Sequence, residues 1–128
     1  EIIGYMNITA IPRTPHFVKG VINLRGQVLP VVDMRTKFGM PTIEVTEQTC
    51  IIVVEVDDGE CTFWTGIIVD QVREVQDVES TQIEKPPNFD STVSSSFILG
   101  MAKIGDTVKI LLNIDKVLAG SELSKFTM

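Results

Sequence analysis

The stretch Lys-Gly-Val-Ile-Asn-Leu-Arg-Gly-Gln-Val-Leu-Pro-Val-Val-Asp, residues Lys19–Asp33, decides the fold. It contains two apolar runs, Val21–Leu24 and Val28–Val32, joined by a short polar stretch around Gly26. Glycine adopts the positive φ of a tight turn at little steric cost, so the stretch predicts a β-hairpin. Pro30 has no N–H to donate, which places it at a sheet edge or at a bulge in the second strand.

A second hairpin is predicted further along the chain. The β-branched runs Thr49–Val56 and Thr62–Val69 flank the polar turn Asp57–Glu60. Both faces of these two strands carry apolar residues. Strands that are sheltered on two sides belong to a closed barrel or a sandwich, because an open sheet would expose one face to water.

The remaining segments add short strands, turns and two short helices. Asp33 is expected to cap the first helix and Gly39 to end it. Many short strands separated by Gly, Asp and Pro turns indicate an all-β fold of the barrel class. We predict strands at Ile2–Ile11, Asp70–Val78 (bent), Phe97–Met101 and Thr107–Ile114, helices at Asp33–Phe38 and Asp115–Phe126, and loops at Pro12–Phe17, Lys85–Asn88 and Ser91–Ser96.

Composition favours a single globular domain. The chain has 128 residues, 44% of them hydrophobic and 22% charged, with a net charge of -6. A chain of this length buries enough surface to fold without a disulfide or a metal. Its basic residues are scattered singly, which argues against nucleic acid as a partner. No apolar run has the length of a membrane span, so any membrane contact is expected to be indirect.

The two cysteines are predicted to be reduced core residues. In the expected hairpin register, Val56 lies opposite Cys61 and Cys50 lies opposite Ile67, which keeps the two sulfurs far apart. Two cysteines at this spacing form neither a disulfide framework nor a metal-binding pair. Reduced cysteines are typical of a cytoplasmic protein.

Catalytic and metal-binding motifs are absent from the sequence. The single histidine, His16, has no second histidine or nearby cysteine to complete a metal site or a triad. Ser94–Ser96 has no adjacent base, and Asp57–Glu60 lacks the alternating ligands of a calcium loop. The carboxylates of Glu1 and Asp70 have no spacing that favours general acid–base chemistry. We therefore expect a protein that is not an enzyme and that uses no metal or cofactor.

Four segments carry a resemblance to a known family. The long segment Pro15–Gly26 resembles the signature of CheW-like domains: Pro, any residue, Phe, an aliphatic residue, Lys-Gly-Val, any residue, Asn-Leu-Arg-Gly. Val28–Arg35, Gly66–Val72 and Gly105–Ile114 are similar to the family as well. The resemblance extends over Glu1–Leu118, and the block from Lys19 to Gly26 is its most specific part.

The resemblance implies both a fold and a role. The implied fold, within a single domain over residues 1–128, is two intertwined SH3-like five-stranded barrels that share an apolar core. Two further strands usually precede the segment matching Glu1–Gly4, so we expect the sequence to start part-way through a strand with N-terminal strands missing. The implied role is a non-catalytic chemotaxis adaptor in the cytoplasm, at the inner face of the membrane. It would couple the cytoplasmic tip of chemoreceptors to the regulatory domain of the histidine kinase CheA.

Candidate binding residues follow from the resemblance together with the local sequence. The family implicates an acid at the Glu1 position and an arginine at the Arg25 position in receptor coupling, and we hypothesise that the two pair across the docking groove. A guanidinium at a hairpin end suits carboxylates and carbonyls of a partner. Further receptor-binding candidates are Gly20, Asn23 and Ile51, and the kinase-binding candidates are Val28 and Leu29.

Each of these assignments has a structural alternative. Gly20 can simply permit a close backbone approach, and Asn23 can cap the hairpin turn. Ile51, Val28 and Leu29 can be ordinary core residues. At the level of function, the rivals are the regulatory domain of CheA, the adaptor half of CheV, and, more remotely, a small barrel enzyme or ligand-binding barrel.

Overall fold

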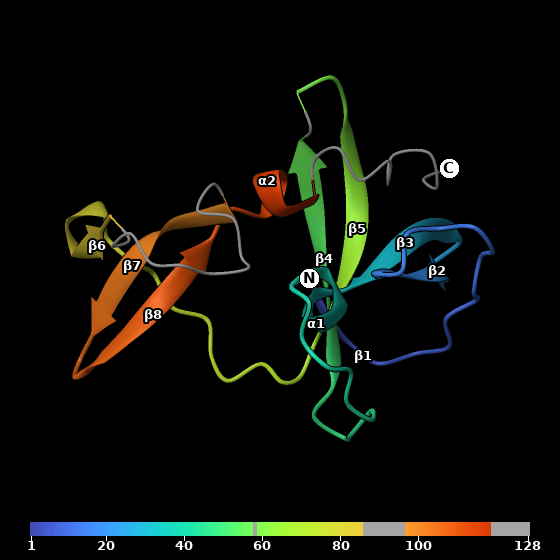
Figure 1. The fold of residues 1–128 in the computed structure, drawn as a ribbon, viewed down its shortest axis with the longest axis horizontal. Helices are drawn as coiled ribbons and strands as arrows, with labels where there is room; N and C mark the ends of the chain where they lie inside the picture. Colours follow the sequence, from blue (N-terminus) through green and yellow to red (C-terminus); the bar gives the residue numbers. More distant parts are fainter. Residues whose placement is uncertain (58, 86–96, 119–128) are drawn as a thin grey trace. The chain divides into compact units, whose positions relative to one another are not determined.

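The computed structural model describes residues 1–57, 59–85 and 97–118 and divides the chain into two compact units (Figure 1). Of the described residues, Glu1–Arg73 and Leu118 belong to the first unit, and those from Glu74 to Val117 belong to the second. Each unit contains its own β-sheet. In the described residues, no helix has the length and apolar character needed to cross a membrane.

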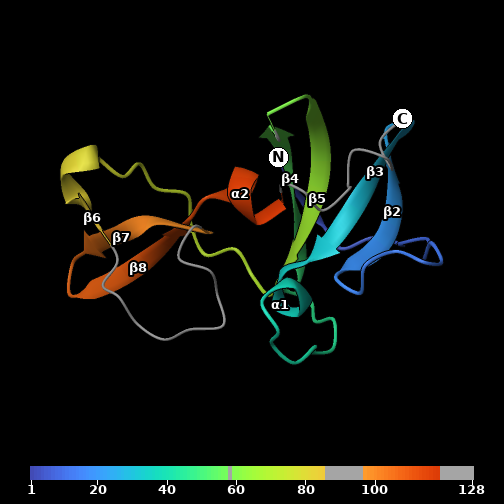
Figure 2. The same ribbon diagram turned by 45° about the horizontal axis from the view of Figure 1, so that its top comes forward.

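The first unit is a five-stranded sheet with the strand order β1-β4-β5-β3-β2. Neighbouring strands are antiparallel except β3 and β5, which run parallel. Figures 1 and 2 show β2 and β3 crossing β4 at a steep angle, so the sheet curls. The strands are β1 (Ile2–Gly4), β2 (Val18–Leu24), β3 (Gln27–Asp33), β4 (Cys50–Asp57) and β5 (Thr62–Val69).

The segment after β1 closes the curled sheet by pairing with the opposite edge. Thr9 forms an isolated bridge with Val21 of β2, through two backbone hydrogen bonds of 2.9 Å each. Beside this bridge lies Gly20, whose φ is 146°. A Cβ at Gly20 would lie 2.7 Å from the carbonyl carbon of Thr9 and closer still to its oxygen. The absence of a side chain at this position is therefore what lets the two edges meet.

Closure encloses an apolar core. The fully or nearly fully buried side chains on the inner face are Ile22, Leu29, Val31, Ile51 and Val53. Half-buried side chains from the closing segment and the strand ends pack against them: Ile3, Met6, Ile8, Leu24 and Ile68. Burying side chains of this kind contributes about 1.5–3 kcal/mol each, which makes this cluster a main source of stability in the first unit.

The other face of the β4–β5 hairpin is buried too. Four of its side chains are at most 4% exposed, and the register of the hairpin places them on the face that points away from the inner core: Val56, Phe63, Thr65 and Ile67. The prediction that both faces of these strands are sheltered is confirmed. Within this face, the Thr65 hydroxyl is buried without a hydrogen-bond partner.

The β2–β3 hairpin follows the predicted pattern. Leu24 pairs with Gln27, which leaves a two-residue turn in which Arg25 and Gly26 have φ values of 52° and 86°. Successive residues with positive φ match the right-handed twist of the strands that they connect. The Asn23 side chain accepts a hydrogen bond of 2.9 Å from the Gly26 N–H and fixes the turn.

Pro30 lies in an interior strand, which differs from the edge position or bulge predicted for it. It pairs with Val21, whose own N–H and carbonyl are directed to Thr9. Pairing of β3 with β5 begins only at Val31, and the bulge in this hairpin lies in β2, between Val18 and Gly20. At Pro30, therefore, neither β2 nor β5 presents a carbonyl that would need an N–H from β3, and the missing N–H of proline costs no hydrogen bond.

The short helix α1 (Met34–Lys37) begins and ends as predicted. The Asp33 side chain accepts a hydrogen bond of 3.0 Å from the Arg35 N–H, which caps the first turn. The chain leaves the helix through Phe38 and through Gly39, whose φ is 73°.

The second unit contains a three-stranded sheet with the order β6-β7-β8 (Figure 2). Gly100 lies beside a bulge in β7, and a Cβ there would lie 2.5 Å from the Ile83 side chain and 2.9 Å from the Glu84 carbonyl. The described residues thus supply five strands to one sheet and three to the other. The elements are η1 (Ser80–Gln82), β6 (Ile83–Glu84), β7 (Ile98–Ile104), β8 (Thr107–Leu112) and α2 (Ile114–Leu118), whose last residue belongs to the first unit.

Several predicted boundaries were wrong. The predicted strand Ile2–Ile11 is regular only over Ile2–Gly4, because the chain then crosses to the other edge of the sheet. Asp70–Val78 contains no strand, and the predicted strand Thr107–Ile114 ends at Leu112. The short elements η1 and β6 were not predicted. Residues 86–96, and the predicted helix beyond Leu118, lie outside the described part of the chain.

The predicted register of the second hairpin was shifted by two residues. Val56 pairs with Phe63 and Cys50 pairs with Val69, because the turn lies one residue later than expected and Asp57 still pairs with Thr62. Cys61 consequently lies in the turn and is exposed, so it is not a core residue, while Cys50 is half-buried. Neither cysteine forms a disulfide.

Replacing Gly20 by alanine is expected to destabilise the first unit strongly. The new Cβ clashes with the Thr9 backbone and alanine is strained at this φ, so we expect a loss of about 3 kcal/mol or more in the free energy of unfolding. Gly26→Ala is the matched control, since its φ is also positive but nothing lies within 4 Å of the added Cβ. Urea unfolding of the two variants measures the difference, and equal losses would show that closure does not depend on Gly20.

Replacing Thr65 by valine is expected to stabilise the protein. The change removes a buried hydroxyl that lacks a partner and keeps the side-chain shape, so we expect a gain of about 1 kcal/mol. Thr62→Val, on the same strand but exposed, controls for the general effect of valine on β-propensity. A loss of stability in Thr65→Val, measured by urea unfolding, would mean that the hydroxyl has a partner in solution.

Candidate interaction site

An ion pair between Glu1 and Arg25 links the two edges of the first sheet. The Arg25 guanidinium donates two hydrogen bonds to the Glu1 carboxylate, at 2.8 Å and 2.5 Å. The backbone of Glu1 is held against β4 by hydrogen bonds with Val53 of 3.1 Å and 2.7 Å, and Arg25 lies in the β2–β3 turn. The predicted pairing of these two side chains is confirmed. That a receptor docks across them stays a prediction.

The ion pair is exposed, with 68% of the Arg25 side chain and 43% of the Glu1 side chain accessible to water. The hydrogen bonds from Arg25 lower the pKa of the Glu1 carboxyl, and the same hydrogen bonds to Glu1 raise the pKa of the Arg25 guanidinium. Such a pair contributes little to stability, because water screens its charges. Its two parallel hydrogen bonds do fix the direction of both groups, which suits them to orient a partner.

Gly20 and Asn23 lie near this pair in sequence but have structural roles. Gly20 is buried and admits the Thr9 backbone. Asn23 is exposed and its carbonyl oxygen is occupied by the Gly26 N–H. The contacts therefore support the structural alternative for each residue, which is close backbone approach for Gly20 and capping of the turn for Asn23. The Asn23 amide group nevertheless remains on the surface.

The apolar candidates divide by burial. Ile51 is 0% exposed and Leu29 is 1% exposed, and both belong to the inner core. Neither side chain reaches the surface of the first unit, so the core alternative describes them. Val28 is half-buried and keeps part of its side chain accessible on β3. Of the three, only Val28 offers surface to a partner.

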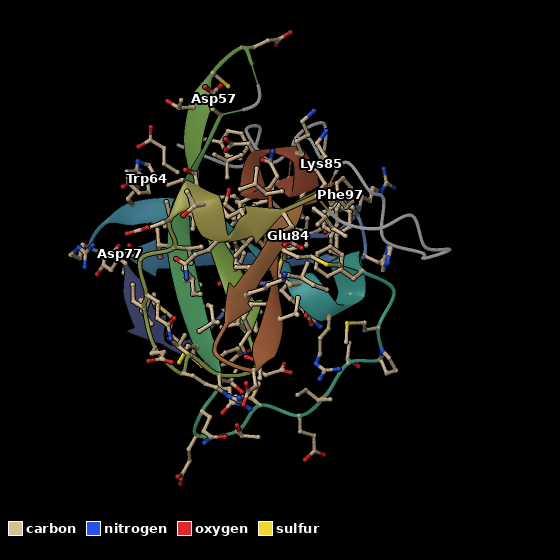
Figure 3. The ribbon with its side chains drawn as sticks, turned by 90° about the vertical axis from the view of Figure 1, so that its left-hand side faces the viewer. Asp57, Trp64, Asp77, Glu84, Lys85 and Phe97 are labelled. Atoms are coloured by element: carbon tan, nitrogen blue, oxygen red, sulfur yellow. The ribbon has the colours of Figure 1, made fainter. Side chains whose placement is uncertain are left out.

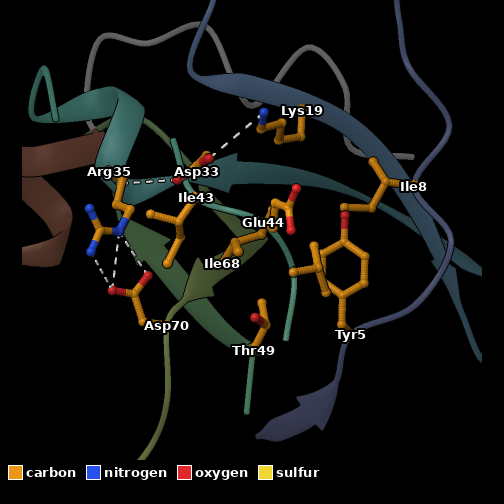
Figure 4. Close-up of a pocket in the computed structure, with 11 residues that line it drawn as sticks. Tyr5, Ile8, Lys19, Asp33, Arg35, Ile43, Glu44, Thr49, Ile68 and Asp70 are labelled. Atoms are coloured by element: carbon orange, nitrogen blue, oxygen red, sulfur yellow. Dashed lines mark hydrogen bonds and ion pairs between the residues drawn. The ribbon is translucent and has the colours of Figure 1, made fainter. Parts of the chain in front are cut away.

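Sequence reasoning missed a second charged cluster at the opposite end of β3. The Arg35 guanidinium donates to both oxygens of Asp70, at 2.9 Å and 2.8 Å, and Lys19 lies 3.8 Å from Asp33 (Figure 4). The hydrogen bonds from Arg35 lower the pKa of the Asp70 carboxyl. Asp33 ends β3 and Asp70 follows β5, and the parallel pairing of these strands brings both acids to one end. Only knowledge of that parallel pairing would have revealed the cluster.

A cavity of about 250 Å³ opens beside these charges. Apolar side chains from the closing segment, from the loop before β4 and from β5 form much of the rest of its wall (Figure 4). The lining residues are Tyr5, Ile8, Lys19, Asp33, Arg35, Ile43, Glu44, Val45, Thr49, Ile68 and Asp70.

The remaining surface of the first unit adds one unexpected aromatic residue. Trp64 is 42% exposed on β5, and Figure 3 shows it on the flank of the hairpin whose tip carries Asp57. The Asp57 side chain accepts a hydrogen bond of 2.9 Å from the Gly59 N–H. His16 is exposed and its ring lies edge-on to Phe17. Within the described residues, no three His, Cys, Asp or Glu side chains gather as metal ligands do.

The first unit is thus a curled, closed sheet that carries exposed ion pairs. Comparison with known proteins gives its family. The family model "CheW-like domain" matches residues 1–122. The chain is 36% identical to "Chemotaxis protein CheW" of Klebsiella aerogenes, over 97% of this chain and 72% of that protein. It is 35% identical to "Chemotaxis protein CheW" of Rhizobium meliloti, over 95% of this chain and 76% of that protein.

A solved structure agrees with these relatives. The crystal structure of scaffolding protein TtCheW from Thermoanaerobacter tengcongensis is similar with a TM-score of 0.80 and 34% identity, over 96% of this chain and 77% of that one. The chain belongs to the CheW-like domain family. Its mainly β fold is that of the family, in line with SH3-like barrels, and its role is that of a chemotaxis coupling adaptor.

Replacing Arg25 by glutamine is expected to raise the pKa of the Glu1 carboxyl toward its ordinary value, because the hydrogen bonds that favour the carboxylate are lost. A lowered pKa means that the pair's contribution to stability is present above the ordinary pKa and is lost as pH falls through the lowered one. Carboxyl-carbon NMR titration measures both values. Lys103→Gln, which removes the partner of Glu84 in the second unit, is the control that leaves Glu1 unchanged.

Proposed function

We propose that this chain couples the cytoplasmic tip of chemoreceptors to the regulatory domain of the histidine kinase CheA. The observation that carries the proposal is the exposed, doubly hydrogen-bonded Glu1–Arg25 pair, held on a closed sheet in a member of the CheW-like domain family. A bidentate arginine–carboxylate pair presents both charges in fixed directions. A receptor helix tip with carboxylates and backbone carbonyls could exchange hydrogen bonds with the guanidinium, while its own donors meet Glu1.

The anchoring of both partners supports this assignment. The Glu1 backbone is tied to β4, and the Arg25 turn is fixed by the Asn23 side chain. The backbone of neither residue has to be ordered when a partner binds, which removes that part of the entropic cost of association. We assign Glu1 and Arg25 as receptor-contacting residues, and Gly20 and Asn23 as residues that position them.

For the kinase side we propose the accessible part of Val28, next to the buried Leu29, as one element of the contact. Small apolar surfaces rimmed by polar groups are typical of contacts between similar folds. A half-buried valine on a rigid strand fits such a contact, and Leu29 supports it from the core.

We infer that the chain does no bond chemistry. Its carboxylates Glu1 and Asp70 are each paired with an arginine, which stabilises their charged forms and makes them poor general acids. Signal would pass through binding alone: a receptor conformation that contacts the adaptor differently shifts the kinase equilibrium by the difference in interaction energy. Assembly into an array at the cytoplasmic membrane face, as a single two-unit domain, would strengthen modest contacts through effective concentration.

Charge reversal of Arg25 tests the receptor contact. Arg25→Glu is expected to lower the affinity for a receptor cytoplasmic fragment by about tenfold or more, because a charged anchor is lost and a like charge faces Glu1. Co-sedimentation with receptor fragments, with and without CheA, measures the loss.

Arg13→Glu is the matched control for this variant. Arg13 is also exposed and has a positive φ of 63°, so its replacement carries the same backbone cost and the same change in net charge. Receptor binding that falls equally in both variants would show a general charge effect. Unchanged binding in Arg25→Glu would remove the pair from the receptor contact.

A further inference from the structure

The loop between α1 and β4 presents unpaired backbone beside the cavity of the first unit. At its start, the Met40 N–H donates to the Arg35 carbonyl and the Pro41 carbonyl accepts from the Arg35 guanidinium at 3.3 Å. At its end, the Thr46 N–H donates to the Thr49 hydroxyl at 2.9 Å. Between these anchors, the backbone groups of residues 42–45 form no hydrogen bond within the described chain. They are held at both ends and free to pair with a partner.

The side chains of this loop are unusually apolar for their exposure. Ile43 and Val45 are each 52% exposed, and Tyr5, across the cavity, is 41% exposed. All three line the cavity of about 250 Å³, together with Ile8 and Ile68. This volume is below the roughly 300–1,000 Å³ that small-molecule sites usually have. It fits one or two side chains of a partner.

The charged residues that line the cavity indicate which charge a partner's side chain would carry. Its two cations are engaged, Lys19 with Asp33 and Arg35 with Asp70. The third carboxylate, Glu44, forms no ion pair with any described residue, and Figure 4 shows it within the cavity between Ile43 and Tyr5 in that view. The lining therefore has one negative charge in excess. A cation beside it would meet both a carboxylate and the aromatic side chain of Tyr5.

We propose that this cavity and residues 42–45 form a docking site for a short segment of a partner protein, one basic residue flanked by apolar residues. The basic side chain enters beside Glu44 and Tyr5, the apolar neighbours cover Ile43 and Val45, and the segment's backbone pairs with the unpaired groups of the loop. The net charge of -6 steers such a segment toward the chain. The proposal is independent of the receptor contact at Glu1 and Arg25.

The single tyrosine of the chain provides a direct readout. The chain is labelled with 3-fluorotyrosine, so that one fluorine signal reports on Tyr5, and titrated with the peptide acetyl-Ala-Val-Lys-Val-Ala-amide. We expect a saturable shift of that signal and of the amides of residues 42–45. The matched acidic peptide, acetyl-Ala-Val-Glu-Val-Ala-amide, is expected to bind at least about fivefold more weakly, because it opposes Glu44.

Two variants separate the site from the rest of the loop. Glu44→Gln is expected to weaken the basic peptide about fivefold, and Glu47→Gln, exposed in the same loop but outside the cavity lining, leaves it unchanged. Ile43→Ser is expected to weaken both peptides. These results together support the proposal.

Three other results would overturn the proposal. Butylamine shifting the Tyr5 signal as strongly as the peptide would indicate a site for small amines. A shift on concentrating the chain alone would indicate self-association through this surface. Absence of any shift with either peptide would show that the cavity holds no such segment.

Discussion

The fold of the first unit depends on the close approach of Thr9 to Gly20. The strand order β1-β4-β5-β3-β2 leaves β1 and β2 at opposite edges, and unpaired edges of a curled apolar sheet are costly and prone to aggregation. The Thr9–Val21 bridge joins these edges through the chain that follows β1, and it forms only because position 20 has no side chain. The inner core is enclosed by this one contact between backbones.

Two ion pairs of the first unit, Glu1–Arg25 and Arg35–Asp70, follow from the way its strands are joined. Glu1 is attached to one edge of the sheet and Arg25 lies in the turn at the other, so they meet only when the edges do. Arg35 and Asp70 meet because β3 and β5 run parallel and end together. Each pair joins residues far apart in sequence and lies partly in water. These ion pairs therefore fix the positions of the charged side chains more than they stabilise the fold.

The local elements could be read from the sequence, whereas the way they join could not. The Arg25-Gly26 turn and the Asp33 cap each have a short-range signal, and both are found. The register of β4 against β5 was misjudged because the composition of a polar stretch does not specify at which residue the turn begins. The bridge of Thr9 and the parallel pairing of β3 with β5 are long-range, and no local pattern encodes them.

In the candidate site, too, some features could be predicted from the sequence and others could not. The pairing of Glu1 with Arg25 was expected from the family, and the apolar candidates Ile51 and Leu29 proved to be core. Apolar residues on a strand of a small barrel carry no mark that distinguishes the inner face from an interface, since both remove them from water. Charged residues are different, because burying them unpaired is too costly to be common. In a binding module of this size, exposed charge held by backbone contacts is thus better evidence for a contact surface than apolar sequence is.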